Sequence, residues 1–198
     1  MVGDEIVGAV LAGGTSSRMG ADKAKAILAG SSLRDRALSV LRLVFREVAL
    51  SVSAPEPELA GCTVVVDRHT NSGPLAALEA TLTAADGRAV FVLACDLPLV
   101  DEPVVRRIVS RAEGLERAEG ARAWVARADG HIQPLCGLYS APCRDIARAR
   151  LDSGRLSMRG LLGALEVTEV ELDDLGSDRL LNVNRPADLE RARRAVDV

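Results

Sequence analysis

Apolar residues occur along the chain in two alternating patterns, short continuous runs and longer stretches with helical spacing. The continuous runs occupy residues 6–11, 48–52, 63–66 and 89–94. Such runs are typical of strands in a parallel sheet, where both faces are covered. Helical patterns are present over residues 31–45, from Pro74 to about Ala84, and from Pro103 to about Glu113. This alternation of strand and helix predicts an α/β fold.

The second half of the chain continues the alternation after a hairpin signal. Asp129-Gly130 stands between strands expected at 121–128 and 132–139, and this dipeptide is a common hairpin turn. The remaining expected elements are helices near 143–152 and 157–165, a strand at 166–172 and a helix from Pro186. We therefore predict a single three-layer α/β/α, Rossmann-like domain over residues 1–198, with a mostly parallel sheet.

The composition excludes several classes of protein. A net charge of −3 and 2% aromatic residues argue against nucleic-acid binding, which needs a basic field and stacking platforms. Residues 1–5 lack a basic leader, and the apolar runs are too short to span a membrane. We expect a cytoplasmic protein with no membrane partner, whose four cysteines are reduced and packed. His69 and His131 are expected to be exposed to solvent.

The segment Leu11-Ala-Gly-Gly-Thr-Ser-Ser-Arg-Met-Gly-Ala-Asp-Lys23 leaves the first expected strand as a glycine-rich loop. Its glycines let the backbone approach a ligand, its hydroxyls add donors, and Arg18 and Lys23 bring positive charge. The spacing matches neither the P-loop nor the dinucleotide-binding fingerprint. A plain surface turn is the alternative, but the combination of glycines, hydroxyls and cations favours phosphate binding.

Two carboxylates follow strands at the same edge of the expected sheet. Asp67 comes after the strand at 63–66, and Asp96 comes after the strand at 89–94. The carboxyl ends of parallel strands meet at one edge, so these groups should lie near the glycine-rich loop. A carboxylate ending a buried strand is costly without a cation, and Mg²⁺ binds through one or two carboxylates plus substrate phosphates. The alternatives are a turn or helix cap at Asp96 and a turn at Asp67.

Five motifs together resemble those of the MobA-like nucleotidyltransferases and extend over nearly the whole chain. They are Leu11 to Lys23, Gly73-Pro74-Leu75, Cys95-Asp96-Leu97-Pro98, Gln133-Pro134-Leu135 and Asn182-Val183-Asn184-Arg185-Pro186. The resemblance implies a nucleotidyltransferase domain that transfers GMP from GTP to the terminal phosphate of molybdopterin. It also implies Mg²⁺ as cofactor and pyrophosphate as product. Transfer to a phosphate needs no protein nucleophile, because positioning and charge neutralisation can carry the reaction.

The residue patterns and the resemblance together give the candidate site. The catalytic candidates are Arg18, Lys23 and Asp96, and Asp96 is also the candidate metal ligand. The nucleotide-binding candidates are Leu11, Ala12, Gly13, Gly14, Lys23, Ser51, Asp67, Gly73, Pro74, Leu75 and Asp96. The acceptor-binding candidates are Arg155, Arg159, Asn182 and Asn184. Three positions depart from the family pattern: Ala77 replaces a frequent glycine, Arg185 a threonine, and Ser51 or Ser53 an asparagine.

The acceptor candidates depend on local structure. Arg155 and Arg159 share a face if they are helical and could hold a phosphate, with ordinary solvated arginines as the alternative. Asn182 and Asn184 are expected to alternate on a strand, so that their amides face one side toward a pterin edge or a phosphate. Their alternative role is capping of the helix at Pro186.

Other functions stay open. A cytidylyl-transferring relative shares the fold, but Gly13-Gly14 and Gly73-Pro74-Leu75 favour guanine by resemblance, and sugar-phosphate or isoprenoid-precursor transferases are more distant. A non-catalytic nucleotide-binding module is the alternative from another class, and the joint presence of Lys23, Asp67 and Asp96 argues against it. The expected partners are GTP and molybdopterin, with transient cofactor-delivery or acceptor proteins as further candidates. We expect a monomer or a weak oligomer.

Overall fold

A seven-stranded sheet with the strand order β5-β4-β1-β6-β8-β7-β9 forms the centre of the molecule. The computed structural model describes residues 5–12, 23–57, 59, 61–69, 72–112 and 120–196. Within these residues a second, two-stranded sheet joins β2 (Ile27–Leu28) to β3 (Ser31–Ser32).

Four parallel strands form one half of the large sheet. In spatial order they are β5 (Thr63–Val66), β4 (Val48–Val52), β1 (Ile6–Leu11) and β6 (Ala89–Ala94). Leu11 at the end of β1 lies opposite Ser51 on β4 and Ala94 on β6, so these three strands end at one level. Every residue of β1, β4 and β6 is buried, as expected for strands covered on both faces. The structure thus confirms the four predicted strands.

The other half of the sheet contains β8 (His131–Tyr139), β7 (Arg122–Ala128) and β9 (Glu166–Glu171). β8 is antiparallel to both β6 and β7, whereas β9 is parallel to β7. β7 and β8 form the hairpin predicted at Asp129-Gly130, where the two residues have φ values of 48° and 72°. Positive φ at both central residues is the requirement of a type I′ turn.

A bulge in β8 bends this hairpin. Val125 of β7 lies opposite Gly137, but the next residue, Ala126, lies opposite Gln133, so the residues between are extra on the β8 side. Pro134 is one of the extra residues, and its missing N–H therefore breaks no ladder hydrogen bond. β8 pairs with β6 only from Cys136 onward, and its earlier part pairs with β7 alone.

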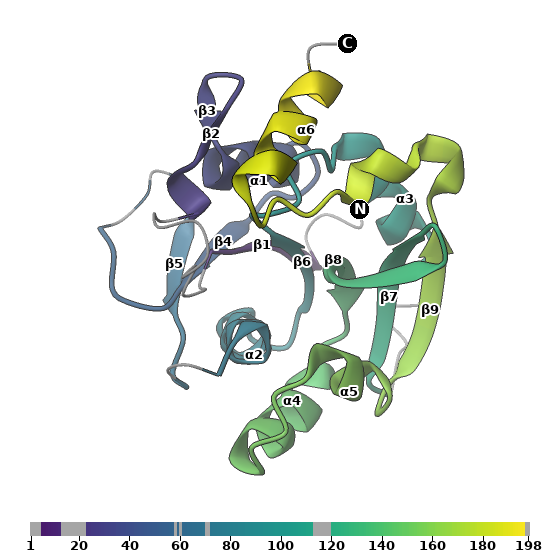
Figure 1. The fold of residues 1–198 in the computed structure, drawn as a ribbon. Helices are drawn as coiled ribbons and strands as arrows, with labels where there is room; N and C mark the ends of the chain where they lie inside the picture. Colours follow the sequence, from purple (N-terminus) through teal and green to yellow (C-terminus); the bar gives the residue numbers. More distant parts are fainter. Residues whose placement is uncertain are drawn as a thin grey trace.

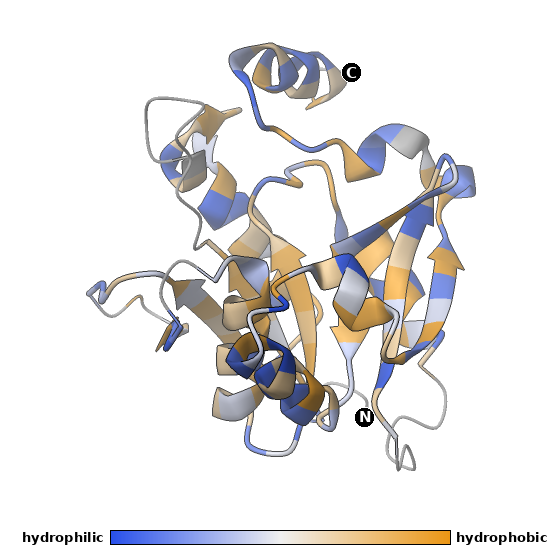
Figure 2. Ribbon diagram, turned by 60° about the horizontal axis from the view of Figure 1, so that its bottom comes forward, coloured by the Kyte–Doolittle hydropathy of each residue, from blue (hydrophilic) through white to orange (hydrophobic). Residues whose placement is uncertain are grey.

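Helices cover both faces of the sheet, which gives the predicted three-layer α/β/α arrangement (Figure 1). One face carries α1 (Leu33–Arg42) and α3 (Glu102–Ser110), and the other carries α2 (Pro74–Ala84), α4 (Cys143–Asp152) and α5 (Met158–Leu162). Alternate residues of β1 serve the two faces: Ile6 packs with α1 and α3, and Val7 packs with α2. Figure 2 shows the hydrophobic residues gathered in the strands between these helices.

α2 is buried on its outer side as well, because α4 packs over it. Glu79 on that outer side is 1% exposed and accepts a hydrogen bond from Nε of Arg148 on α4 at 3.0 Å. A hydroxyl of Thr83 also donates to Glu79 at 3.0 Å. A buried carboxylate needs such partners, so this ion pair fixes how α4 sits on α2.

A smaller apolar cluster joins the N-terminal hairpin to α6 (Pro186–Val196). Its buried members are Leu28, Leu33, Val183 and Ala192. The chain reaches α6 through the 3-10 helices η4 (Asp173–Leu175) and η5 (Ser177–Leu180), and a further one, η2, spans Lys23–Lys25. Among the helices of the described ranges, none has the length and apolar character needed to cross a membrane.

Two local predictions were wrong, and one element was missed. The helix expected over 31–45 begins only after Ser32, whose hydroxyl accepts from the backbone N–H of Asp35 as an N-cap, and it ends at Arg42. The helix expected at 157–165 is shortened to α5. The β2–β3 hairpin was not predicted at all. That residues 1–198 form one domain stays a prediction.

Candidate active site at the carboxyl edge of the sheet

The ends of β1, β4 and β5 are tied together by backbone hydrogen bonds. The N–H of Ala12 donates to the carbonyl oxygen of Ser51 at 3.0 Å, and the N–H of Asp67 donates to that of Val52 at 3.0 Å. The N–H of Cys95 likewise donates to the carbonyl oxygen of Leu11 at 3.2 Å. The parallel ladder therefore continues to the point where the predicted site residues begin.

Ser51 and Asp67 form a hydrogen-bonded pair at this edge. The Ser51 hydroxyl donates to Oδ1 of Asp67 at 2.5 Å. Ser51 is fully buried, whereas Asp67 is half-buried. Burial raises the pKa of Asp67 above its usual value, and the hydrogen bond from Ser51 opposes that rise. The Ser51 hydroxyl therefore acts on the Asp67 carboxylate, and its predicted contact with the nucleotide stays a prediction.

The Gly73-Pro74-Leu75 motif forms the start of α2. Gly73 has φ of 66°, a conformation that favours glycine, and Pro74 occupies the first helical turn. Leu75 is fully buried in the core beneath the helix. Gly73 is exposed at the end of α2 that follows β5, so the backbone here is accessible to a ligand, whereas the Leu75 side chain is structural.

Asp96 lies in a turn directly after β6 and is half-buried, with Oδ1 shielded from solvent. Its backbone carbonyl oxygen accepts a hydrogen bond from the N–H of Val183 at 2.8 Å. The alternative role as cap of the helix at Pro103 is excluded, because Asp101 is that cap and accepts from the N–H of Val104 at 3.3 Å. The contact with Val183 brings the Cys95-Asp96 motif against the Asn182–Asn184 motif.

A cavity of about 260 Å³ brings Gln133 together with Asn182. Its other walls come from the β7–β8 hairpin, from residues 178–181 and from Arg191 of α6. Gln133 was not among the predicted site residues, although the Gln133-Pro134-Leu135 motif carried the signal. The bulge of β8 at Pro134 explains the placement, because it bends the strand just where Gln133 begins.

Asn182 and Asn184, the first predicted acceptor pair, have a different local structure from the strand that was expected. Residues 181–185 form no strand, and Asn184 is exposed while Asn182 is half-buried. The cap of α6 comes from Asp188, whose Oδ2 accepts from the backbone N–H groups of Asn184 and Arg185 at 2.9 and 2.8 Å.

Arg155 and Arg159 do not share a helix face. α4 ends at Asp152, and Arg155 follows in a turn where its Nε donates to the Ser153 hydroxyl at 2.8 Å. Arg159 belongs to α5, which begins three residues after Arg155. Both side chains are exposed, which agrees with the alternative of solvated arginines.

Several predicted groups lie outside the described residues. They include Gly13, Gly14 and Arg18 of the glycine-rich loop. The backbone of Lys23 is described as the first residue of η2, but its side chain is not.

The histidines and cysteines differ in their exposure to solvent. His131 is exposed as predicted, whereas His69, also predicted to be exposed, is partly buried. Cys95, Cys136 and Cys143 are buried, Cys62 is half-buried, and none of the four forms a disulfide. Burial raises the pKa of Cys136 to about 12 and that of Cys143 to about 11, so neither thiol is a nucleophile at neutral pH.

Comparisons with known proteins agree on one family. Residues 8–169 match the model of the MobA-like NTP transferase domain. A relative from Opitutus terrae, named probable molybdenum cofactor guanylyltransferase, is 35% identical, and the match covers 96% of this chain and 95% of that protein.

Two solved structures share the fold. Molybdopterin-guanine dinucleotide biosynthesis protein A from Archaeoglobus fulgidus superposes with a TM-score of 0.76 at 22% identity, covering 96% of this chain and 98% of that one. 2-C-methyl-D-erythritol 4-phosphate cytidylyltransferase from Thermus thermophilus superposes with a TM-score of 0.69 at 19% identity, covering the same shares. The fold alone therefore does not choose between guanine and cytosine.

Proposed function

Because this chain belongs to the MobA-like NTP transferase family, we propose that it transfers GMP from GTP to the terminal phosphate of molybdopterin. An oxygen of that phosphate attacks the α-phosphorus of GTP, and the bond to the bridging oxygen of the β-phosphate breaks. Pyrophosphate leaves with the electron pair of that bond. The products are pyrophosphate and the guanine dinucleotide form of the cofactor.

One structural observation supports this proposal most directly. The 2.8 Å hydrogen bond from the N–H of Val183 to the carbonyl oxygen of Asp96 joins the two motifs assigned to the two substrates. A transferase must hold both substrates in contact, and a near-attack geometry supplies much of the rate in such reactions. A module that only binds a nucleotide has no need of this second motif at the same edge.

We assign the nucleotide to the half of the edge formed by β1, β4, β5 and α2. The glycine-rich loop with Arg18 and Lys23 would hold the triphosphate, and the exposed backbone at Gly73 would border the base. Asp67 would contact the nucleoside through its half-buried carboxylate, whose orientation Ser51 fixes. The other candidates there, Leu11, Ala12, Pro74 and Leu75, act through backbone position and packing.

Mg²⁺ fits this donor set. Within the residues that the structure describes, no group of three or more histidine, cysteine or carboxylate side chains could hold a metal ion alone. Asp96 presents a partly shielded carboxylate next to the predicted triphosphate, and Mg²⁺ is commonly held by one or two carboxylates plus phosphates and water. When bound, the ion would neutralise charge on the phosphates.

We assign molybdopterin to the cavity between Gln133 and Asn182. The amides of these residues offer both donors and acceptors, which suit the edge of a pterin. Asn184 extends the same segment toward solvent, and Arg155 and Arg159 stay further candidates for the acceptor's phosphate.

The test is a reaction with purified protein, Mg²⁺, molybdopterin and each of GTP, CTP, ATP and UTP. We expect pyrophosphate release and dinucleotide formation with GTP, and a larger rise in melting temperature with GTP than with CTP. A clear preference for CTP would assign the chain to the cytidylyl-transferring relatives. Binding of GTP without pyrophosphate release, with the acceptor present, would indicate a non-catalytic module.

A further inference from the structure

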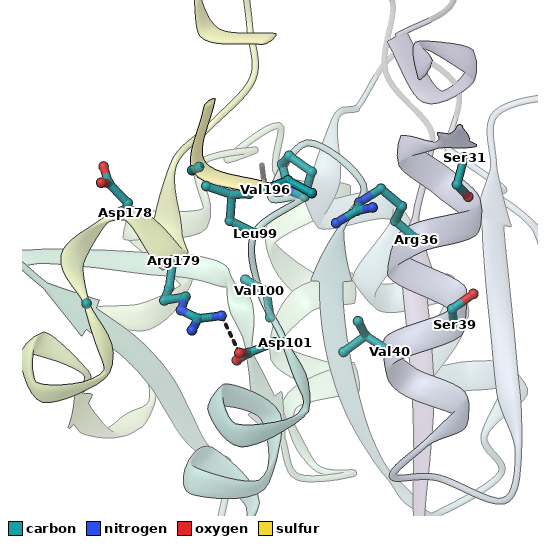
Figure 3. A pocket seen from close by; sticks show the side chains of 13 residues that line it. Ser31, Arg36, Ser39, Val40, Leu99, Val100, Asp101, Asp178, Arg179 and Val196 are labelled. Carbon is teal, nitrogen blue, oxygen red and sulfur yellow. Dashed lines mark hydrogen bonds and ion pairs between the residues drawn. The ribbon is translucent and has the colours of Figure 1, made fainter. Parts of the chain in front are cut away.

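A cavity of about 880 Å³ lies between α1 and the segments that precede α3 and α6 (Figure 3), and it shares Asp178 with the lining of the cavity beside Asn182. It is lined by Ser31, Arg36, Ser39, Val40, residues 98–101, Gly176, Asp178, Arg179, Ala195 and Val196. None of the candidate site residues belongs to this lining. Its volume lies in the range of ordinary small-molecule pockets.

Arg36 supplies this cavity with a cation that has no ion-pair partner among the residues that the structure describes. Its side chain extends from α1 toward the loop that carries Leu99 (Figure 3). Its Nε is shielded from solvent and makes no hydrogen bond, and among the described residues no carboxylate forms an ion pair with it. The Nε of Arg34 on the same helix is also shielded and makes no hydrogen bond, but Arg34 differs in having a carboxylate partner, because its Nη1 donates to Glu56 at 2.8 Å. A shielded guanidinium nitrogen is unfavourable unless an anion or another acceptor meets it.

The remaining walls are partly apolar, and the carboxylate of Asp178 on them is paired with Arg191, which lies outside the lining. Val40, Leu99, Val100 and Val196 contribute apolar side chains. Arg179 on the far wall is neutralised by its ion pair with Asp101. The hydroxyls of Ser31 and Ser39 flank Arg36 on the side of α1. A ligand with one anionic head group and an apolar body would match this distribution of groups.

The cavity is also connected to the predicted site through the chain. Residues 98–101 follow Asp96 directly, and Arg179 precedes Asn182 by three residues. Asp101 and Arg179 tie these two segments together at the cavity, as Val183 and Asp96 do at the site. A ligand held here would contact both segments.

We propose that this cavity is a second ligand site, which binds a small organic anion through Arg36. The ligand carries a carboxylate or phosphate head on an apolar body. Arg36 meets the head with a charge-assisted hydrogen bond, and the apolar side chains of the loop and of α6 cover the body. This inference is independent of the proposed transfer reaction.

Calorimetric titration of the full chain with phenyl phosphate, benzoate and inorganic phosphate tests the site. We expect phenyl phosphate or benzoate to bind more tightly than inorganic phosphate, and the tighter of the two identifies the head group. Arg36→Gln should weaken that binding at least about tenfold, as the loss of a charged hydrogen bond does. Ser39→Trp, which fills the cavity from an exposed position, should weaken it as well. Arg34→Gln is the matched control and should leave the affinity unchanged.

Three results would overturn the proposal. They are no binding of either organic anion, equal losses in Arg36→Gln and Arg34→Gln, and equal affinities for inorganic phosphate and phenyl phosphate. Melting temperatures of the three variants show whether each is folded. Because the readout is binding of these probes, failure here leaves the transfer reaction untouched, and failure of the transfer reaction leaves this site untouched.

Discussion

The two halves of the large sheet hold their part of the site in different ways. In the parallel half, Asp67 follows the edge strand β5 and Asp96 follows the buried strand β6, and backbone hydrogen bonds continue to the strand ends. The half formed by β8, β7 and β9 is called the antiparallel half, because β8 is antiparallel to both of its neighbours. On this side Gln133 stands at a bulge, and Asn182 lies in a segment outside any strand. The first half is held by regular ladders, whereas the second depends on a few specific contacts. The nucleotide side should therefore be rigid, and the acceptor side should be the more easily disturbed.

Asp96 stands where the halves meet, so its replacement should have the largest effect. Asp96→Asn keeps the shape but removes the charge proposed to hold Mg²⁺, and we expect kcat to fall at least about 100-fold. The melting temperature should stay unchanged. Asp152→Asn, at the exposed end of α4, is the control. Near-normal kcat at saturating Mg²⁺ would assign Asp96 to the turn alone.

The close packing at the bulge of β8 gives a stability test of the antiparallel half. A Cβ at Gly137 would lie 2.7 Å from the carbonyl oxygen of Trp124 and 2.9 Å from a methyl group of Val125. Gly137→Ala should lower the free energy of unfolding by about 1–3 kcal/mol, as overpacking does. Gly120→Ala, with open space around it, should have no such effect. Denaturant unfolding measures both, and equal stabilities would mean that the bulge relaxes freely.

Asn182 tests whether the acceptor side is separate from the nucleotide side. Asn182→Ala removes an amide from the cavity beside Gln133, and we expect the KM for molybdopterin to rise about tenfold, the worth of one or two hydrogen bonds. The KM for GTP should not change. Gln133→Ala should behave in the same way. If either variant instead weakens GTP binding, the division of the edge between two substrates is wrong.

Ser51 gives the smallest expected effect, a change in pH dependence. Its hydroxyl stabilises the ionised form of Asp67 and so opposes the rise in pKa that burial causes. In Ser51→Ala the pKa of Asp67 should rise further, so less of the carboxylate is ionised at a given acidic pH. The acidic limb of the profile of kcat/KM against pH should move to higher pH. Ser53→Ala, at an exposed position two residues on, should leave the profile in place.

The parallel half could be predicted from the sequence because local patterns determine it. Buried strands are apolar at successive positions, so the continuous apolar runs along the chain defined the bounds of β1 and β6. Asp67 after β5 and Asp96 after β6 were visible as the polar residues at which the apolar runs stop. The link between Ser51 and Asp67 was not visible, since it joins side chains from two strands.

The antiparallel half could be predicted only in part because distant contacts determine it. Alternation suggested a strand at Asn182 and Asn184, but no neighbouring strand offers them a ladder, and Val183 bonds to Asp96 instead. The prediction that Arg155 and Arg159 share a helix face was wrong, because α4 ends before Arg155 and α5 begins after it. Nothing in the sequence pattern pointed to Arg36 as a ligand-binding residue, since only the fold brings residues 98–101 and α6 opposite α1.

The bond between Val183 and Asp96 also has a consequence for what the end of the chain contributes. The last strand of the large sheet ends at Glu171, so the sheet itself uses no later residue. Val183 and Ala192 pack with Leu28 and Leu33, which lie near the other end of the sequence. A chain shortened before Val183 would keep all seven strands of the large sheet but lose the backbone hydrogen bond that joins the two proposed substrate sides.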